Sequence, residues 1–256
     1  MSNAIEVTFT PTEFGAFGRR DLGQTVAVVF DVLRATTTML TALSAGAERI
    51  IPVAEIAEAL ALRQTDPDVL LAGERNGLLI GADLTGGVRF DLGNSPREFT
   101  PDRVRGRTVV MTTTNGTRAL RACAGALRTW VGGFVNLGAL TRLIERHRPT
   151  RLLLVCSGTL EQAAIEDTLA AGALADAVWP LYADGQVADS AQIARHLYRQ
   201  FAADLPGAMS FSRNGRRLLG RPELRDDVGF CLRPDTVKIT AEMYADGAVR
   251  RLEADA

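Results

Sequence analysis

The sequence contains few of the residues that build metal or disulfide frameworks. Lysine occurs once, at Lys238, and histidine twice, at His147 and His196, among 256 residues. Two histidines argue against a histidine-rich zinc site. The three cysteines lie far apart with no C-x-x-C pair, so we expect no disulfide framework, and reduced thiols fit the cytoplasm.

Long apolar runs and a large excess of one charge are also absent. No run approaches the roughly 18–20 residues of a membrane span, and the first residues lack the basic start and apolar core of a signal peptide. The formal net charge of −1 creates no basic field for nucleic acid and no acidic excess typical of disorder. We therefore expect a cytoplasmic protein whose partner is neither nucleic acid nor membrane. A homodimer stays an open alternative.

Apolar segments alternate with helix-like segments along the chain. Strands are predicted at 5–10, 25–30, 49–53, 69–72, 108–111, 129–135, 151–156 and 236–240. Helices are predicted at 36–44, 55–64, 118–126, 137–148, 165–178 and, with a break near Pro206, 190–219. Residues 73–101 have no regular period, and a loop of this length is usually functional. The alternation predicts an α/β fold with three α/β/α layers, a mostly parallel or mixed central sheet and a single domain over 1–256.

Polar residues follow four of the predicted strands. They are DVLRATTT at 31–38, GERNG at 73–77, TTTNGT at 112–117, and SGT at 157–159 with Glu166 and Asp167 further on. Ligands of open α/β sheets bind at the carboxyl ends of the strands. The four strand ends together therefore predict a polar site within 25–178.

The residue types at these strand ends favour an anion beside a hard cation. Thr and Gly runs that enter helices supply hydroxyls and backbone N–H groups for an oxyanion, and Arg34 and Arg75 are candidate clamps. Such a combination is typical of phosphoryl chemistry. The carboxylates able to hold a Mg²⁺ ion are Asp31, Glu74, Asp91 and Asp167.

Structural roles also explain several of these residues. The threonines at 36–38 and 112–117 fit N-caps and hydroxyl-lined turns, and the acids at 166–167 fit the first turn of a helix. In FDLGNSPR, at 90–97, the polar residues fit a turn. Asp31 is harder to explain in this way, because a carboxylate after six apolar residues must be paired, ligated or protonated.

The common phosphate-handling motifs are missing. The chain has no G-x-x-x-x-G-K-[ST] and no G-x-S-x-G. Asp31 is followed two places later by Leu33, so the Asp-x-Asp pair of haloacid-dehalogenase-type phosphatases is absent, and no cysteine has an arginine six places on. The remaining design is a metal-assisted site of a less familiar kind.

Six blocks in one order carry a resemblance: DVLRATTTM (31–39), GERNG (73–77), FDLGNSPREFT (90–100), TTTNGTRAL (112–120), CSGT (156–159) and EDTLAAGAL (166–174). Together they resemble the 2-phosphosulfolactate phosphatase family. The resemblance implies a Mg²⁺-dependent hydrolase with an α/β/α fold that converts 2-phospho-3-sulfolactate to 3-sulfolactate and phosphate. In methanogens this reaction belongs to coenzyme M synthesis.

The resemblance also implies a set of site residues. Asp31 and Asp91 are expected near the metal, with Glu74 and Asp167 as further ligands, and Asp31, Asp91 and Asp167 as the catalytic acids. Whether one of them activates water or attacks phosphorus stays open. The expected substrate-binding residues are Arg34, Arg75, Asn94, Thr113, Thr114, Asn115, Gly116, Thr117, Ser157 and Gly158.

One departure from the family pattern supports other functions. The segment LLIGADLTGGVR, at 78–89, lies where a short linker is expected, and it is expected to reshape a substrate-facing loop. The alternatives are an anion-binding module without turnover, a phosphatase for another phosphorylated hydroxy acid, and transfer of the phosphoryl group to an acceptor other than water.

Overall fold

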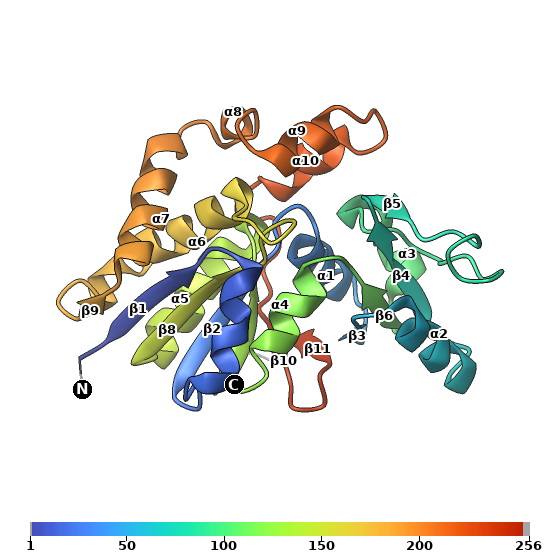
Figure 1. Ribbon diagram of the computed structural model, residues 1–256, viewed down its shortest axis with the longest axis horizontal. Coiled ribbons are helices and arrows are strands. Elements are labelled where there is room, and N and C mark those ends of the chain that lie inside the picture. The colour runs from blue at the N-terminus through green and yellow to red at the C-terminus, as the bar shows by residue number, and fades with distance from the viewer. Residues whose placement is uncertain (1, 253–256) are drawn as a thin grey trace.

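An eleven-stranded sheet runs through the part of the chain that the computed structural model describes, residues 2–252 (Figure 1). Its order is β5-β4-β6-β3-β11-β10-β7-β2-β8-β1-β9. Two sets of parallel strands make up most of it. The larger set contains β7 (Arg128–Gly132), β2 (Thr25–Phe30), β8 (Arg151–Cys156), β1 (Ala4–Thr8) and β9 (Gln186–Val187). The smaller set contains β4 (Leu70–Arg75), β6 (Thr108–Thr112) and β3 (Arg49–Pro52).

A C-terminal hairpin joins the two sets. β10 (Ala241–Met243) pairs antiparallel with β7 and with β11 (Val249–Arg251), and β11 pairs antiparallel with β3. The short β5 (Leu78–Leu79) pairs antiparallel with β4 at the outer edge. The sheet is therefore mixed.

Helices cover both faces of the larger set. On one face, α5 (Leu137–His147), α6 (Ile165–Ala177) and α7 (Asp189–Phe201) share a core with Val26, Val28 and Leu154. On the other face, α1 (Ala35–Ser44), α4 (Gly116–Ala122) and the 3₁₀ helix η1 (Pro11–Arg19) share a core with Val29 and Val155. Since successive side chains of a strand point to opposite faces, strands that are apolar throughout feed both cores. The predicted three-layer α/β fold is confirmed.

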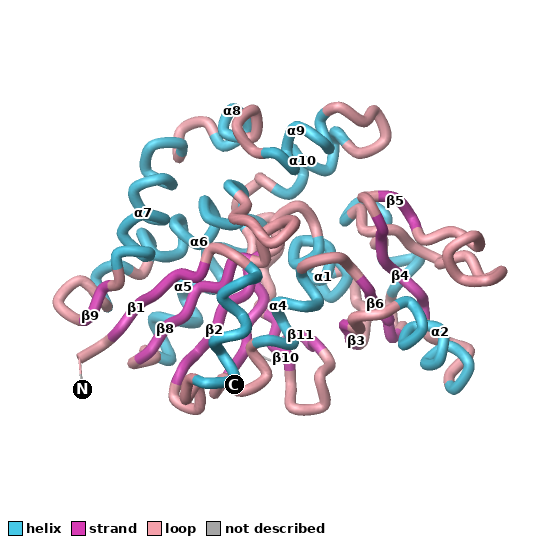
Figure 2. Tube along the Cα trace, in the orientation of Figure 1, coloured by secondary structure: helices cyan, strands magenta, loops and turns pink. Residues whose placement is uncertain are grey.

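The remaining helices lie at the edges of these layers. α2 (Ile56–Thr65) packs over the smaller set with its own apolar cluster. Figures 1 and 2 show α8, α9 and α10 above the loops that follow the strands. The bounds are Pro96–Glu98 (η2), Pro101–Val104 (α3), Phe134–Asn136 (η3), Trp179–Leu181 (η4), Leu205–Ala208 (α8), Arg213–Leu219 (α9) and Arg225–Cys231 (α10).

The C-terminal part of the chain differs from the prediction. The expected strand at 236–240 is wrong, because these residues pair with no strand of the sheet. Val237 and Ile239 are buried in the core and Lys238 is exposed, so the alternating pattern arises from packing and from single backbone hydrogen bonds to Val135 and Leu252, without a strand ladder. The true strands are β10 and β11, and α10 precedes them.

Two expectations from composition can be compared with the structure. The three cysteines, Cys123, Cys156 and Cys231, are buried and none forms a disulfide. Among residues 2–252, no helix is both long and apolar enough to cross a membrane.

Candidate active site

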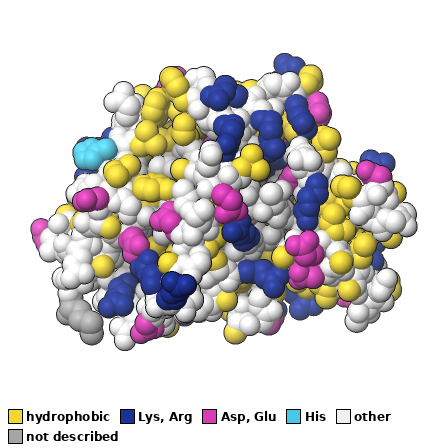
Figure 3. Space-filling view, viewed as in Figure 1, with side chains coloured by type: hydrophobic (Ala, Val, Ile, Leu, Met, Phe, Trp, Pro, Cys, Tyr) yellow, Lys and Arg dark blue, Asp and Glu magenta, His cyan; other side chains and the backbone are white. Residues whose placement is uncertain are grey.

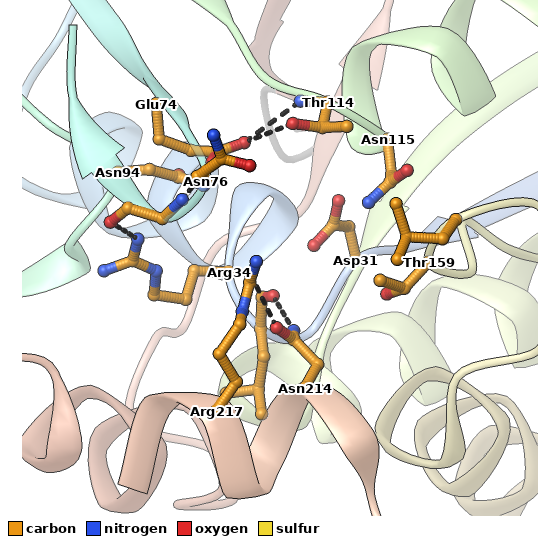
Figure 4. A pocket seen from close by; sticks show the side chains of 13 residues that line it. Asp31, Arg34, Glu74, Asn76, Asn94, Thr114, Asn115, Thr159, Asn214 and Arg217 are labelled. Carbon is orange, nitrogen blue, oxygen red and sulfur yellow. Dashed lines mark hydrogen bonds between the residues drawn. The ribbon is translucent and has the colours of Figure 1, made fainter. Parts of the chain in front are cut away.

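A small cavity of about 60 Å³ lies where the ends of strands from both sets meet (Figure 4). Its walls come from segments that are far apart in the sequence: the turn after β2, the end of β4, the loops after β6 and β8, and α9. The predicted convergence of four strand ends is therefore present. Asn94 of the loop before Pro96–Glu98 also lines the cavity, and helix α9 adds a wall that the sequence patterns did not indicate.

Asp31 is one of two buried carboxylates that line this cavity, the other being Glu74. Asp31 follows β2 directly, and its Oδ1 accepts the Ala35 N–H at 3.1 Å. Burial has the largest effect and raises the pKa of Asp31. The hydrogen bond from the Ala35 N–H lowers the pKa, and the charges of Glu74 and Glu166 raise it further, so that the net pKa is about 7. A group that changes protonation near neutral pH at a cavity wall is typical of an active site.

Gly116 allows α4 to begin directly against Asp31. A Cβ on Gly116 would lie 2.8 Å from Oδ2 of Asp31 and 2.6 Å from the Cβ of Ala35. Both distances are shorter than a real Cβ contact. The structure shows a steric role for Gly116, since the absent side chain gives Asp31 its room; its predicted role in binding substrate stays a prediction.

Asp167 links the turn that follows Asp31 to the loop after β8. Its Oδ1 accepts the Val32 N–H at 2.8 Å and its Oδ2 accepts the Gly158 N–H at 3.1 Å. Burial, and then the charges of Asp31 and Glu166, raise the pKa of Asp167. Asp167 does not line the cavity, so the structure gives it a positioning role between the loops after β2 and β8.

Glu74 lines the cavity and also holds two loops together. Its Oε1 accepts hydrogen bonds from the Thr114 N–H at 3.1 Å and the Thr114 hydroxyl at 2.8 Å, and its Oε2 accepts the Gly77 N–H at 2.6 Å. Both oxygens are thus engaged by the protein. This leaves Asp31 as the cavity carboxylate with the fewest protein partners.

The two predicted arginine clamps are both engaged within the protein. Arg34 lines the cavity but is buried, and it donates to Asp227 at 2.7 Å and to the Gly77 carbonyl at 2.9 Å. Arg75 donates to the Glu74 carbonyl and to the Thr112 hydroxyl, and it does not line the cavity. Asp227 also accepts from Ser95 and Arg97, so a buried ion-pair network fixes Arg34 in place.

Arg217 is the cavity cation without a carboxylate partner among the described residues. Its Nη2 donates to Oδ1 of Asn214 at 2.8 Å, and Figure 4 shows its guanidinium extending from α9 toward the centre of the cavity. Partial burial lowers its pKa, yet an arginine stays protonated at every physiological pH. The free positive charge of the cavity therefore comes from Arg217.

Most hydroxyls of TTTNGT serve the fold. The Thr117 hydroxyl donates to the Thr113 carbonyl at 3.0 Å, and both side chains are buried away from the cavity. The Thr112 hydroxyl donates to the Ala54 carbonyl. Only Thr114 and Asn115 of this run line the cavity. The structural explanation thus holds for most of the run, and the predicted binding roles of Thr113 and Thr117 find no support in the geometry.

The loop after β8 contributes Thr159 and Leu160 to the wall, while Ser157 and Gly158 lie behind it. Gly158 has a φ of +65°, and a Cβ there would lie 2.5 Å from the Gln162 carbonyl. Its N–H is the one that Asp167 accepts. Ser157 and Gly158 therefore shape the loop and do not face the cavity.

Asp91 is not brought to the cavity. Its carboxylate accepts the Leu71 N–H at 2.7 Å and forms an ion pair with Arg63, with 35% of the side chain exposed. Asp91 does not line the cavity, because the chain at Asp91 pairs with β4 and the carboxylate contacts Arg63 of α2; its expected place near the metal stays a prediction. The segment 78–89 contributes no residue to the cavity lining, but its strand β5 pairs with Glu74 and Arg75 of β4.

Two oxygen donors of the cavity suit a hard cation. One is the Asp31 carboxylate. The other is Oδ1 of Asn94, which is buried and has no hydrogen-bond donor among the described residues. In residues 2–252, no three His, Cys, Asp or Glu side chains come together as a metal cluster.

Comparison with known proteins shows the family. The sequence profile of the family described as "2-phosphosulpholactate phosphatase" matches residues 16–245. The chain belongs to the 2-phosphosulfolactate phosphatase family.

The sequences of several named relatives align with most of this chain. A protein of Symbiobacterium thermophilum called "Probable 2-phosphosulfolactate phosphatase" is 37% identical over 235 residues, which are 91% of this chain and 97% of the relative. Proteins with the same name are 39% identical in Caldicellulosiruptor saccharolyticus, over 86% of this chain and 90% of the relative, and 41% identical in Deinococcus radiodurans, over 84% and 85%.

In this member of the 2-phosphosulfolactate phosphatase family, several wall residues lie outside the blocks that carried the resemblance. Asn214 and Arg217 are three residues apart on α9, so they lie on one face of the helix, and Asn214 also donates to the Leu33 carbonyl at 2.7 Å. The run RNGRR at 213–217 places three arginines on α9. No apolar strand precedes this run, so the pattern of polar strand ends does not point to it. Asn76 and Thr159 also line the cavity; both lie within the quoted strand ends, GERNG and SGT, but neither is among the expected binding residues.

Proposed function

We propose that this protein hydrolyses 2-phospho-3-sulfolactate to 3-sulfolactate and phosphate with the help of Mg²⁺. Family membership and the names of the relatives support this substrate. The observation that carries the proposal is the placement at one small polar cavity of a buried carboxylate with a raised pKa, Asp31, and of Arg217, which has no carboxylate partner among residues 2–252.

Arg217 supplies the anion recognition that the substrate needs. The substrate carries a phosphate, a sulfonate and a carboxylate, and a guanidinium matches the geometry of each through two parallel N–H donors. Figure 3 shows basic side chains gathered over α8–α10, above the site, and all basic residues of this part of the chain are arginines. Such a cluster raises the local concentration of anions and their association rate.

The cavity fits a Mg²⁺ ion held in part by the substrate. Mg²⁺ prefers six oxygen ligands and is usually bound by one or two carboxylates together with waters and substrate phosphates. The Asp31 carboxylate and the unpartnered Asn94 amide oxygen would hold it. When bound, the ion would neutralise charge on the phosphoryl oxygens.

The cavity is smaller than the whole substrate requires. Ligand pockets usually enclose about 300–1,000 Å³, whereas this one encloses about 60 Å³, roughly the space for a single oxyanion group. We place the phosphate next to Asp31. The rest of the substrate then extends toward the mouth, where the exposed Leu160 and Arg217 lie, and binding has to widen that mouth.

Phosphate release from a panel of esters tests the proposal. The panel contains 2-phospho-3-sulfolactate, 2-phospholactate and 2-phosphoglycerate, each with Mg²⁺ and with EDTA. We expect Mg²⁺-dependent release that is fastest with the sulfonated ester. Faster turnover of another ester would keep the chemistry and refute the substrate. Tight binding of sulfolactate without turnover of any ester would identify a binding module and refute the activity.

A further inference from the structure

We propose that a groove beside α5 is a second anion-binding site and takes a compact polyanion with two linked phosphoryl-type groups. The groove encloses about 360 Å³ and shares no residue with the active cavity. Its cations are Arg142, Arg146, Lys238 and Arg251.

These cations converge from three separate parts of the chain. Arg142 and Arg146 are four residues apart and lie on one face of α5, Lys238 belongs to the extended segment before β10, and Arg251 ends β11. A basic residue in the last turn of a helix complements the helix dipole. The helix dipole therefore explains the position of Arg146, but it does not explain Arg142, Lys238 and Arg251.

No carboxylate among residues 2–252 lies within ion-pair distance of any of the four cations. Some arginines of the chain have such partners, as Arg128 has in Glu242 and Arg195 in Asp176, while others that are exposed have none within the same range, among them Arg105 and Arg225. Because arginine is abundant, the lack of a partner does not single out these cations; the grouping of four cations around one groove without a carboxylate in its lining does. Four unpaired cations around one groove repel one another, and a multiply charged anion would relieve that repulsion.

The floor of the groove indicates which anion fits. It is made of the aliphatic side chains of Ala139, Leu143, Ile239 and Leu252, and the lining contains neither an aromatic ring nor a carboxylate. A nucleobase would find no ring to stack on and a ribose no acid to bind its hydroxyls. The recognisable feature is therefore closely spaced negative charge, which two linked phosphoryl groups supply in the smallest volume.

Isothermal titration calorimetry with methylenediphosphonate tests the site. This probe has two linked phosphonate groups and resists hydrolysis, and EDTA keeps Mg²⁺ out of the titration. Because the active cavity also attracts anions, three variants are compared with the wild type. R142Q/K238Q removes two charges of the groove, and R217Q removes the free cation of the cavity. R121Q/R199Q is the matched control, since it removes two exposed arginines that each face a carboxylate.

We expect R142Q/K238Q to weaken one class of binding by about tenfold or more, and R217Q and the control to leave that class unchanged. Phosphatase activity of R142Q/K238Q should match the wild type, its thermal stability should be equal or higher because repulsion is relieved, and affinity should fall as salt rises. Unchanged affinity in R142Q/K238Q, or an equal loss in the control, would overturn the proposal. Failure of the activity assays would leave this result intact, because the groove and the cavity have separate variants.

The chain continues from Leu252 into Glu253 and Asp255, which lie outside the described residues. The same titration on E253Q/D255N therefore asks whether the chain's own acids compete for the groove. We expect the affinity for methylenediphosphonate to change by less than about threefold. A gain of about tenfold or more would identify the C-terminal acids as the occupant and overturn the proposal of a free ligand.

Discussion

Replacing Asp31 by Asn should make the metal-free protein more stable at alkaline pH while removing its activity. Asn has the same shape and retains an oxygen that can accept the Ala35 N–H, but it carries no charge to bury. A carboxylate whose pKa is raised in the folded state favours folding at low pH and opposes it once ionised. Active sites often contain such destabilising groups.

The size of the effect follows from the pKa. Burial raises the pKa of Asp31 from 3.8 to about 7, and each unit corresponds to about 1.4 kcal/mol, so full ionisation costs the fold roughly 4 kcal/mol at most. The wild type loses this stability progressively as pH rises from about 4 through about 7. The variant does not titrate at this position, so its advantage should be absent near pH 4 and largest at pH 8.

Urea unfolding at pH 4.5 and pH 8 in EDTA measures the difference. For a chain of this size, a gain of a few kcal/mol also raises the melting temperature by on the order of 10 °C. Asp91→Asn is the control, because Asp91 is partly exposed and paired with Arg63, and it should give no gain. A variant of Asp31 that is no more stable than the wild type at pH 8 would refute the reasoning.

If Asp31 holds Mg²⁺, adding the ion should make the wild type more stable than the Asp31→Asn variant. Mg²⁺ at pH 8 should stabilise the wild type, because a ligand that binds only the folded state raises its stability by mass action. The Asp31→Asn variant should gain little. Equal stabilisation of both proteins by Mg²⁺ would place the ion elsewhere and refute the proposed ligand, independently of any activity assay.

Three further substitutions test the site. Arg217→Lys keeps the charge but loses the bidentate donors, so kcat/KM should fall by roughly 10- to 100-fold, mainly through KM, while the melting temperature stays unchanged. Gly116→Ala places a Cβ 2.8 Å from Oδ2 of Asp31 and should lower kcat by about tenfold or more, whereas Gly125→Ala, which meets no atom within 4 Å, should be neutral in the same assay. Asp227→Asn leaves a buried arginine without its counter-charge and should lower the free energy of unfolding by about 3–5 kcal/mol in urea; a loss below about 1 kcal/mol would show that the pair is not desolvated.

The strands that carry the site were predictable because their sequence signal is local. β2 and β8 are apolar throughout, since both faces of the sheet are covered, and the predicted bounds of 25–30 and 151–156 match the structure. The hairpin β10–β11 gave no such signal, because each strand has three residues. Its position between the two parallel sets depends on long-range pairing that a local pattern does not contain.

Site residues were predictable from the sequence only where they directly follow an apolar strand. Asp31 was found by its place after an apolar strand, and Glu74 in the same way. The identity of the free cation was not predictable, because Arg34 is neutralised by Asp227, 193 residues further along the chain. Arg217 takes that role from a helix whose sequence has no motif. The contact of Asp91 with Arg63 was not predictable for the same reason, since the two residues lie on different elements.

The most direct test of the central claim compares Asp31→Asn with Asp91→Asn in one assay. Phosphate release from 2-phospho-3-sulfolactate is measured with Mg²⁺ for both variants and the wild type, after circular dichroism has shown that all three are folded. We predict that Asp91→Asn stays close to the wild type and that Asp31→Asn loses about 100-fold or more in kcat. An active Asp31→Asn, or a folded Asp91→Asn that is equally inactive, would contradict the cavity at Asp31 as the active site.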